Sequence, residues 1–168
     1  MRRALAIQPG LAGNLIEPAP ALVAAPLAAP GLSTDHAAGL DLILEGFLLH
    51  HGRPRHLDLP DIGRRVLAGD YCYAHGLVWV AEAGDLHIIE LLADLVAMSA
   101  ALVSTGDRDG LPPLWRTTIA AIADDDPAFS ERLRLAKDAL RTRSDTAPLH
   151  RLAIGLPDAH ELQEALDA

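Results

Sequence analysis

One short stretch of the chain gathers imidazole and basic side chains. His50, His51, Arg53, Arg55 and His56 lie within a few residues of one another. Arginine offers a bidentate fork that matches a phosphate group. The stretch therefore indicates either an anion-binding site or a solvated turn whose polar side chains bind nothing. A zinc site made by the three histidines is disfavoured, because their spacing is not that of helical ligands and no acid accompanies them.

Three consecutive carboxylates form a second candidate group. Asp124, Asp125 and Asp126 stand directly before Pro127. Clustered carboxylates can hold Mg²⁺, but neighbouring positions on a helix point in different directions. Acids directly before a proline are typical helix caps. Capping is therefore the favoured interpretation.

A ridge of polar side chains crosses the most apolar segment. His87, Glu90 and Asp94 follow one another at three- and four-residue spacing. Such a ridge can ligate a metal or take part in catalysis. It is more typical of a solvated stripe or of hydrogen bonds at an interface, so no catalytic or metal-binding residue is assigned.

A Gly-Asp pair interrupts another apolar helical pattern. Gly69 and Asp70 are both poor helix formers on propensity alone. Local violations of this kind indicate close helix packing at Gly69 and a buried partner for Asp70, with Tyr71 at the same surface. Cys72 is expected to be a small core residue.

These residues must be positioned by helices. Proline, glycine and capping residues bound six segments with helical spacing of apolar side chains. Ser33, Thr34 or Asp35 can cap the first, Asp58 with Pro60 begins the second, and Asp85 caps the third. The expected fold class is all-α, an antiparallel bundle of five or six helices over approximately 33–51, 58–84, 85–103, 112–123, 126–140 and 157–166.

Two segments have distinctive compositions. The third predicted helix is apolar nearly all round, which predicts a central helix or one that packs in an interface through residues such as Leu92 and Val96. Residues 1–32 are rich in Pro and Ala and predict an extended N-terminal arm, with a short helix near residues 11–16. Residues 33–168 form the helical domain.

Composition excludes several classes of protein. The chain has 168 residues, 50% of them apolar but only 4% aromatic, which disfavours a β fold. Its net charge of -9 argues against a nucleic-acid partner. One cysteine, no convincing signal peptide and no uninterrupted apolar span predict a cytoplasmic protein without a membrane span.

The Gly-Asp region resembles a known family. The residues Leu67–Tyr71, followed by Ala74, Leu77 and Gly84-Asp85, resemble a helix of the all-helical trans-polyprenyl diphosphate synthases. In that family a Gly-Arg-Pro turn precedes an Ala-Gly-Asp-Tyr helix, and Gly52-Arg53-Pro54 stands at that spacing here. The resemblance covers about residues 40–105 and implies an isoprenoid-synthase-like helical fold.

The catalytic motifs of that family are missing. Its members ionise an allylic diphosphate with Mg²⁺ held by two Asp-Asp-x-x-Asp motifs, because the leaving diphosphate must be neutralised. Here Leu49–Gly52 runs through the place of the first motif, and Asp124–Asp126 lacks the spacing of the second. His50 and His51 replace the arginine pair that binds isopentenyl diphosphate. The chain also has about half the usual length of the family.

The resemblance thus implies a degenerate, non-catalytic homologue that acts as a dimerising or regulatory subunit. Its expected partner is a second copy or a full-length polyprenyl synthase, and no cofactor is expected. The alternative is a small enzyme or binding protein for prenyl diphosphates that uses His50, His51, Arg53 and Arg55, with Mg²⁺ if catalysis is retained. An unrelated helical bundle is a third possibility.

Overall fold

The computed structural model of the chain describes residues 5–6, 8–16, 33–82, 84, 86–124, 126–157 and 159–167. Within these ranges the secondary structure is helical, apart from one isolated antiparallel bridge between Leu15 and Leu57. The all-α prediction is confirmed. In chain order the helices are α2 (Pro9–Ala12), α3 (Thr34–His51), α4 (Ile62–Glu82), α5 (Leu86–Thr105), the 3-10 helix η1 (Arg108–Gly110), α6 (Leu111–Ala123), α7 (Pro127–Arg143), α8 (Ala147–Ala153) and α9 (His160–Asp167).

Side-chain caps begin two of these helices as the sequence predicts. Ser33 Oγ accepts a hydrogen bond from the His36 amide at 3.1 Å at the start of α3. Asp126 Oδ1 accepts from the Ala128 amide at 2.9 Å at the start of α7. Both bonds satisfy amides that the first helical turn leaves without a partner. The capping interpretation is therefore confirmed for Asp126, whereas Asp125 lies outside the described residues.

The start of α4 differs from the prediction. The helix begins at Ile62, later than the expected start at Asp58. Its cap is Asp61, whose Oδ1 accepts from the Arg64 amide at 2.8 Å. The predicted cap of α5, Asp85, lies outside the described residues.

Eight α-helices are present in the described parts of the chain, rather than five or six. The two additional helices are short. α2 begins before the short helix expected near residues 11–16 and overlaps it at residues 11 and 12, whereas α8 was not expected. α8 follows a break at Ser144, whose left-handed backbone (φ 54) ends α7, and a helix of seven residues carries too little periodic pattern to be found from sequence.

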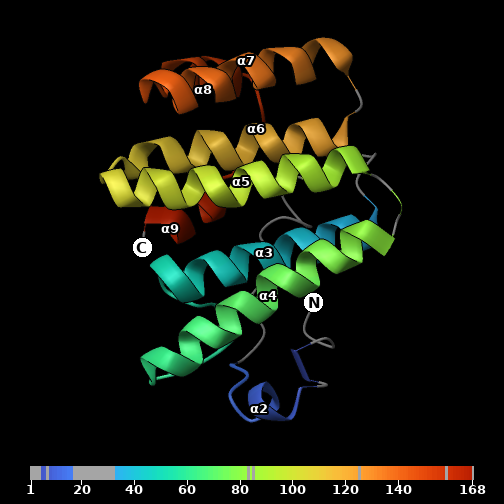
Figure 1. Cartoon of the computed structure of the whole chain (residues 1–168), viewed down its shortest axis with the longest axis vertical. Helices are drawn as coiled ribbons and strands as arrows, with labels where there is room; N and C mark the ends of the chain where they lie inside the picture. Colours follow the sequence, from blue (N-terminus) through green and yellow to red (C-terminus); the bar gives the residue numbers. More distant parts are fainter. Residues whose placement is uncertain are drawn as a thin grey trace.

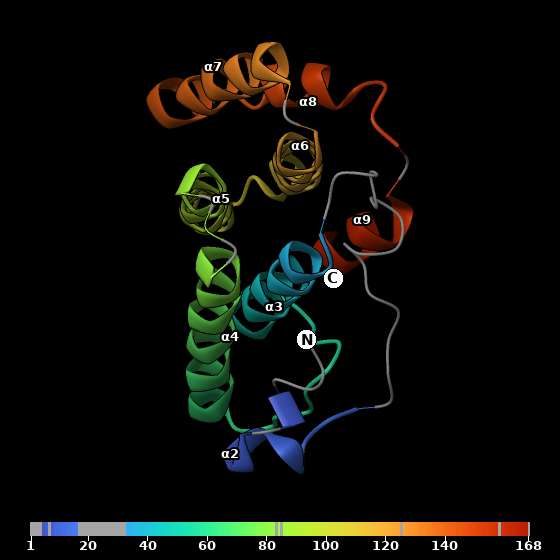
Figure 2. The same cartoon turned by 90° about the vertical axis from the view of Figure 1, so that its right-hand side faces the viewer.

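The helices stack in three layers (Figure 1). α3 and α4 form the first layer, α5 and α6 the middle one, and α7 and α8 the third. A quarter turn shows α4 and α5 stacked along one side of the molecule, with α9 packed against α6 beside α3 (Figure 2). Whether this arrangement is that of the isoprenoid synthases stays a prediction.

α5 lies in the middle layer, but it is less buried than its apolar composition predicts. In α6, 11 of 13 residues are buried and in α3, 12 of 18, whereas α5 buries 7 of 20. The outward positions of α5 are largely alanines, among them Ala93, Ala97 and Ala100, which are exposed. Alanine counts as apolar in a sequence pattern, yet it is tolerated on a solvated helix face because its side chain is small.

Glycines bring α3 and α4 into unusually close contact. Gly39 and Gly46 on α3 face Gly76 and Gly69 on α4, each pair spaced by seven residues. A Cβ added at Gly76 would lie 2.7 Å from the Gly39 carbonyl oxygen, and one at Gly46 would lie 3.0 Å from that of Gly69. This glycine seam lets the two backbones approach where any side chain would collide.

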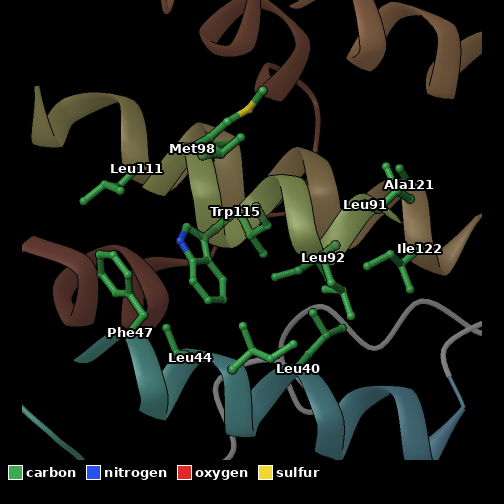
Figure 3. Packing of buried hydrophobic residues seen from close by; sticks show 14 of the residues in the cluster. Leu40, Leu44, Phe47, Leu91, Leu92, Met98, Leu111, Trp115, Ala121 and Ile122 are labelled. Atoms are coloured by element: carbon green, nitrogen blue, oxygen red, sulfur yellow. The ribbon is translucent and has the colours of Figure 1, made fainter. Parts of the chain in front are cut away.

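The main core fills the space between all three layers. Trp115 on α6 and Phe47 on α3 are fully enclosed, and their rings meet at 5.8 Å between centroids (Figure 3). Trp115 Nε1 donates to Ser99 Oγ on α5 at 3.1 Å, so the buried indole nitrogen has a partner.

A second apolar cluster lies on the opposite side of α3. It is formed by Leu5, Leu42, Leu49, Leu57, Leu59, Ala68 and Cys72. Burial raises the pKa of the Cys72 thiol to about 12, and Cys72 is a core residue as the sequence predicts. The predicted N-terminal arm falls in part on residues 1–4, 7 and 17–32, outside the described residues. Its described part packs on α3 and α4 through this cluster.

One described helix, α5, is long and apolar enough to cross a membrane by length and composition alone. No membrane span is predicted from the sequence, because no stretch of 18 residues with a helical pattern is free of charge and proline. Only 33% of its most apolar stretch of 18 residues is buried inside the molecule. Core helices of water-soluble proteins pass the same criterion.

Candidate functional site

His50 and His51 occupy the last turn of α3, but their side chains have different surroundings. His50 Nε2 lies 3.2 Å from Asp70 Oδ1 of α4, without the alignment of a hydrogen bond. The imidazole stacks on Tyr73, with 5.4 Å between ring centroids and 10° between the planes. His50 is thus turned toward α4 and already has an acidic partner.

His51 lies on the other side of the helix end. Its ring is 5.1 Å from that of Phe47, at the edge of the main core. Burial lowers the pKa of His51, and the positive charges of His50 and Arg108 lower it further. A histidine with a depressed pKa is neutral at pH 7 and contributes no charge to anion binding.

The two arginines of the predicted cluster also differ. Arg53 is exposed, whereas Arg55 is half-buried beside the carboxylates of Glu45, Asp41 and Glu161. Burial lowers the pKa of Arg55, and these acids oppose that shift. Two of the four predicted anion-binding residues, His50 and Arg55, therefore face acidic side chains of this same chain.

A buried carboxylate that accepts three hydrogen bonds in this region was not predicted from the sequence. Glu45, buried in the middle of α3, accepts three backbone hydrogen bonds from the loop that follows the helix. Its Oε2 accepts from the Arg55 amide at 3.0 Å, and its Oε1 from His56 at 2.9 Å and Leu57 at 3.2 Å. Burial raises the pKa of Glu45, and the three amides oppose that shift. The carboxylate fixes the loop between α3 and α4.

The Gly-Asp-Tyr residues lie on three different sides of α4. Gly69 faces α3, where an added Cβ would lie 2.5 Å from His50 Nε2. Asp70 is exposed, at 65% of its side chain, and its neighbour His50 is mostly buried. Tyr71 is half-buried against the second apolar cluster, and its ring lies 4.1 Å from that of His75.

The two residues chosen on α5 as packing or interface residues are turned inward. Leu92 is fully buried in the chain's own core, and Val96 is half-buried against it. Leu92 is therefore not available to a partner. Any interface on α5 must use its outward positions instead.

A buried lysine links α5 to α7 and was also missed. Lys137 is the chain's one lysine, and its side chain is 2% exposed. Its Nζ lies 3.4 Å from the Leu91 carbonyl oxygen and 3.8 Å from Asp94 Oδ2. Burial lowers its pKa to about 8, although the charges of Asp94 and Glu90 oppose the shift. Asp94 also pairs with Arg141 Nη2 at 2.5 Å, so one residue of the predicted polar ridge has an interhelical role.

An arginine links the C-terminal turns of α3 and α9. Arg108 of η1 donates from Nη1 to the His51 carbonyl at 3.3 Å and from Nη2 to the Leu166 carbonyl at 2.8 Å. These carbonyls belong to the last turns of α3 and α9. A cation at two helix C-termini is favourable for both helix dipoles.

Near the same end, η1, α6, α8 and α9 enclose an open pocket of about 400 Å³. Arg116 lines it, but its Nη2 donates to the carbonyls of Leu156 and Pro157 at 3.0 and 2.9 Å. This guanidinium secures the linker between α8 and α9.

Comparison of the chain with models of protein families, with curated proteins and with solved structures gives no match. The resemblance to the trans-polyprenyl diphosphate synthases remains an expectation from the sequence.

Proposed function

We propose that this chain is a non-catalytic, polyprenyl-synthase-like helical subunit that associates through the outward side of α5. This α5 face consists of the exposed residues Leu86, Glu90, Ala93, Ala97, Ala100, Ala101 and Ser104. The partner is a second copy of the chain or a full-length polyprenyl synthase.

The observation that carries the proposal is the mismatch between apolarity and burial in α5. Two thirds of its most apolar stretch is not buried inside the molecule, since the buried share is 33%. Leu86, at its start, is 81% exposed. Exposed apolar residues gathered on one face of a helix are typical of protein interfaces.

The shape of the α5 face suits a second helix. Its alanines follow helical spacing, and small side chains let another helix approach closely along the stripe. Val78, 48% exposed, lies on the neighbouring α4, which runs along the same side of the molecule (Figure 2). A partner helix could therefore contact both α4 and α5.

The non-catalytic part of the proposal is supported mainly by the sequence, which lacks both aspartate motifs. The surroundings of the His/Arg cluster, which is His50, His51, Arg53 and Arg55, also favour a non-catalytic role over prenyl diphosphate binding. His50 faces Asp70, Arg55 faces Glu45, and His51 has a depressed pKa. An anion at this position would compete with carboxylates already in place.

Sedimentation and light scattering test the association. The wild-type chain, alone or mixed with a full-length synthase, is expected to form a dimer, and Ala97→Glu is expected to prevent it. Ala128→Glu is the matched control, because Ala128 is an exposed alanine at the start of α7. A wild-type chain that is monomeric alone and does not bind the synthase contradicts the proposal.

An activity assay tests the non-catalytic part separately. The purified chain is incubated with Mg²⁺, an allylic diphosphate and isopentenyl diphosphate. We expect no condensed product. Product formation that is lost in Arg53→Gln would instead establish the alternative, in which the His/Arg cluster binds the diphosphates.

A further inference from the structure

The N-terminal segment and the first turns of α4 enclose a pocket that no part of the proposed function uses. This α2–α4 groove has a volume of about 250 Å³. The elements that line it, α2 and the first turns of α4, lie far from α7 and α8 (Figure 2). It is lined by Gln8, Gly10, Leu11, Arg64, Leu67, Ala68 and Tyr71.

The walls of the groove are mainly apolar. Leu11, Leu67, Ala68 and Tyr71 contribute aliphatic and aromatic side chains, and Leu67 is 70% exposed. A single exposed leucine is ordinary, but an apolar pocket beside it indicates a binding site.

The groove has a cation in its wall. Among the described residues that line it, Arg64 is the charged one, in a chain whose net charge is -9. Arg64 lies in the wall, and its Nη2 donates to the Gly10 carbonyl at 3.0 Å, which holds the guanidinium at the groove. A guanidinium has five N–H donors, so this bond leaves capacity for an anion.

We propose that the α2–α4 groove binds a free, single-chain amphiphilic anion, such as a medium-chain carboxylate. The aliphatic chain lies against Leu11, Leu67 and Tyr71, and the anionic head group binds Arg64. The volume is below the roughly 300–1,000 Å³ of pockets for drug-sized ligands, which favours one narrow chain.

The overall charge favours a dissolved ligand over an anionic membrane surface. A bilayer presents its charge to a whole face of the protein, where a net charge of -9 is repelled. A single head group interacts mainly with its nearest neighbours, because charges beyond about 10 Å are screened at physiological salt.

Calorimetric titration of the full chain with decanoate, below its micelle-forming concentration, tests the proposal. We expect saturable binding of one equivalent. Decyltrimethylammonium, which has the same chain length and the opposite charge, is expected to bind at least about tenfold more weakly, since a charge-assisted contact is replaced by repulsion.

Two variants locate the site. Both change exposed side chains, and Leu67→Gln leaves the hydrogen bond between Arg64 and the Gly10 carbonyl in place. Leu67→Gln and Arg64→Gln are each expected to weaken decanoate binding about tenfold. The matched controls are Leu135→Gln and Arg132→Gln on α7, where Leu135 is 53% exposed. Circular dichroism of all four variants measures whether each one is folded.

The proposal is overturned by any of three results. These are no saturable binding of decanoate, equal effects of the groove and control variants, and binding of anionic vesicles without binding of soluble decanoate. The last result would identify a membrane-docking surface instead.

Discussion

Two helix interfaces of this molecule handle buried polar groups in opposite ways. Between α3 and α4, the buried carboxylate of Glu45 receives three backbone amides, and glycines bring the helices together without a gap. Between α5 and α7, the buried ammonium of Lys137 has one carbonyl at 3.4 Å and one carboxylate at 3.8 Å.

These two sites differ in their partners although both charges are buried, so burial alone does not indicate whether a charge stabilises the fold. A buried charge stabilises the fold where hydrogen bonds replace the lost water, and it is a cost where they do not. Glu45 and Lys137 should therefore respond to removal with opposite signs.

The largest effect is expected for Glu45→Ala. It leaves the amides of Arg55, His56 and Leu57 without their acceptor, and we expect the free energy of unfolding to fall by about 3–5 kcal/mol. Urea denaturation followed by circular dichroism measures it. Glu164→Ala, at an exposed glutamate of α9, is the control and should change little. A loss below about 1 kcal/mol for Glu45→Ala would mean that water replaces the carboxylate.

A smaller loss of stability is expected at Gly76, where the backbones of α3 and α4 lie very close together. In Gly76→Ala the new Cβ would lie 2.6 Å from Ile43 Cγ1 and 2.7 Å from the Gly39 carbonyl oxygen. Overpacking of this kind costs about 1–3 kcal/mol. Gly63→Ala, also on α4, meets only the Asp61 carboxylate at 3.4 Å and should stabilise by up to about 1 kcal/mol. Equal effects of the two substitutions would contradict the close approach of the helices.

The sequence predicted the long helices well because their ends carry local signals. Ser33 and Asp126 with Pro127 mark starts, and Gly52 marks the end of α3. The sequence pattern overestimates the burial of α5, because alanine counts as apolar whether it is buried or exposed. The start of α4 was placed too early because Asp58 and Asp61 are equally good caps by residue type.

The candidate site was less predictable, because its partners come from different elements. His50 meets Asp70, which is twenty positions away on another helix, and only the packing of α3 on α4 shows it. The one local signal for Glu45 is a carboxylate inside an apolar run, between Leu44 and Gly46. No local pattern in the sequence marks Lys137 as buried, since a lysine on an amphipathic helix is ordinarily solvated.

The buried ammonium of Lys137 predicts that the stability of the fold depends on pH. Its pKa in the folded chain is about 8, below the ordinary 10.5. Below pH 8 the amine is protonated in both the folded and unfolded states, and the cost of burying the charge is fully present. Between pH 8 and 10.5 the folded state has lost this proton while the unfolded state retains it, so stability rises with pH.

Lys137→Met keeps the aliphatic length and removes the charge. We expect it to raise the free energy of unfolding at pH 7 by about 1–3 kcal/mol, opposite in sign to the changes expected for Glu45→Ala and Gly76→Ala. Tyrosine and cysteine also titrate above pH 8, so the measurement is the difference between variant and wild-type stability from pH 7 to 10. That difference should shrink as pH rises, because wild-type Lys137 becomes neutral. A variant that is less stable than wild type at pH 7 would show that Asp94 and the Leu91 carbonyl compensate the ammonium, as the three amides do for Glu45.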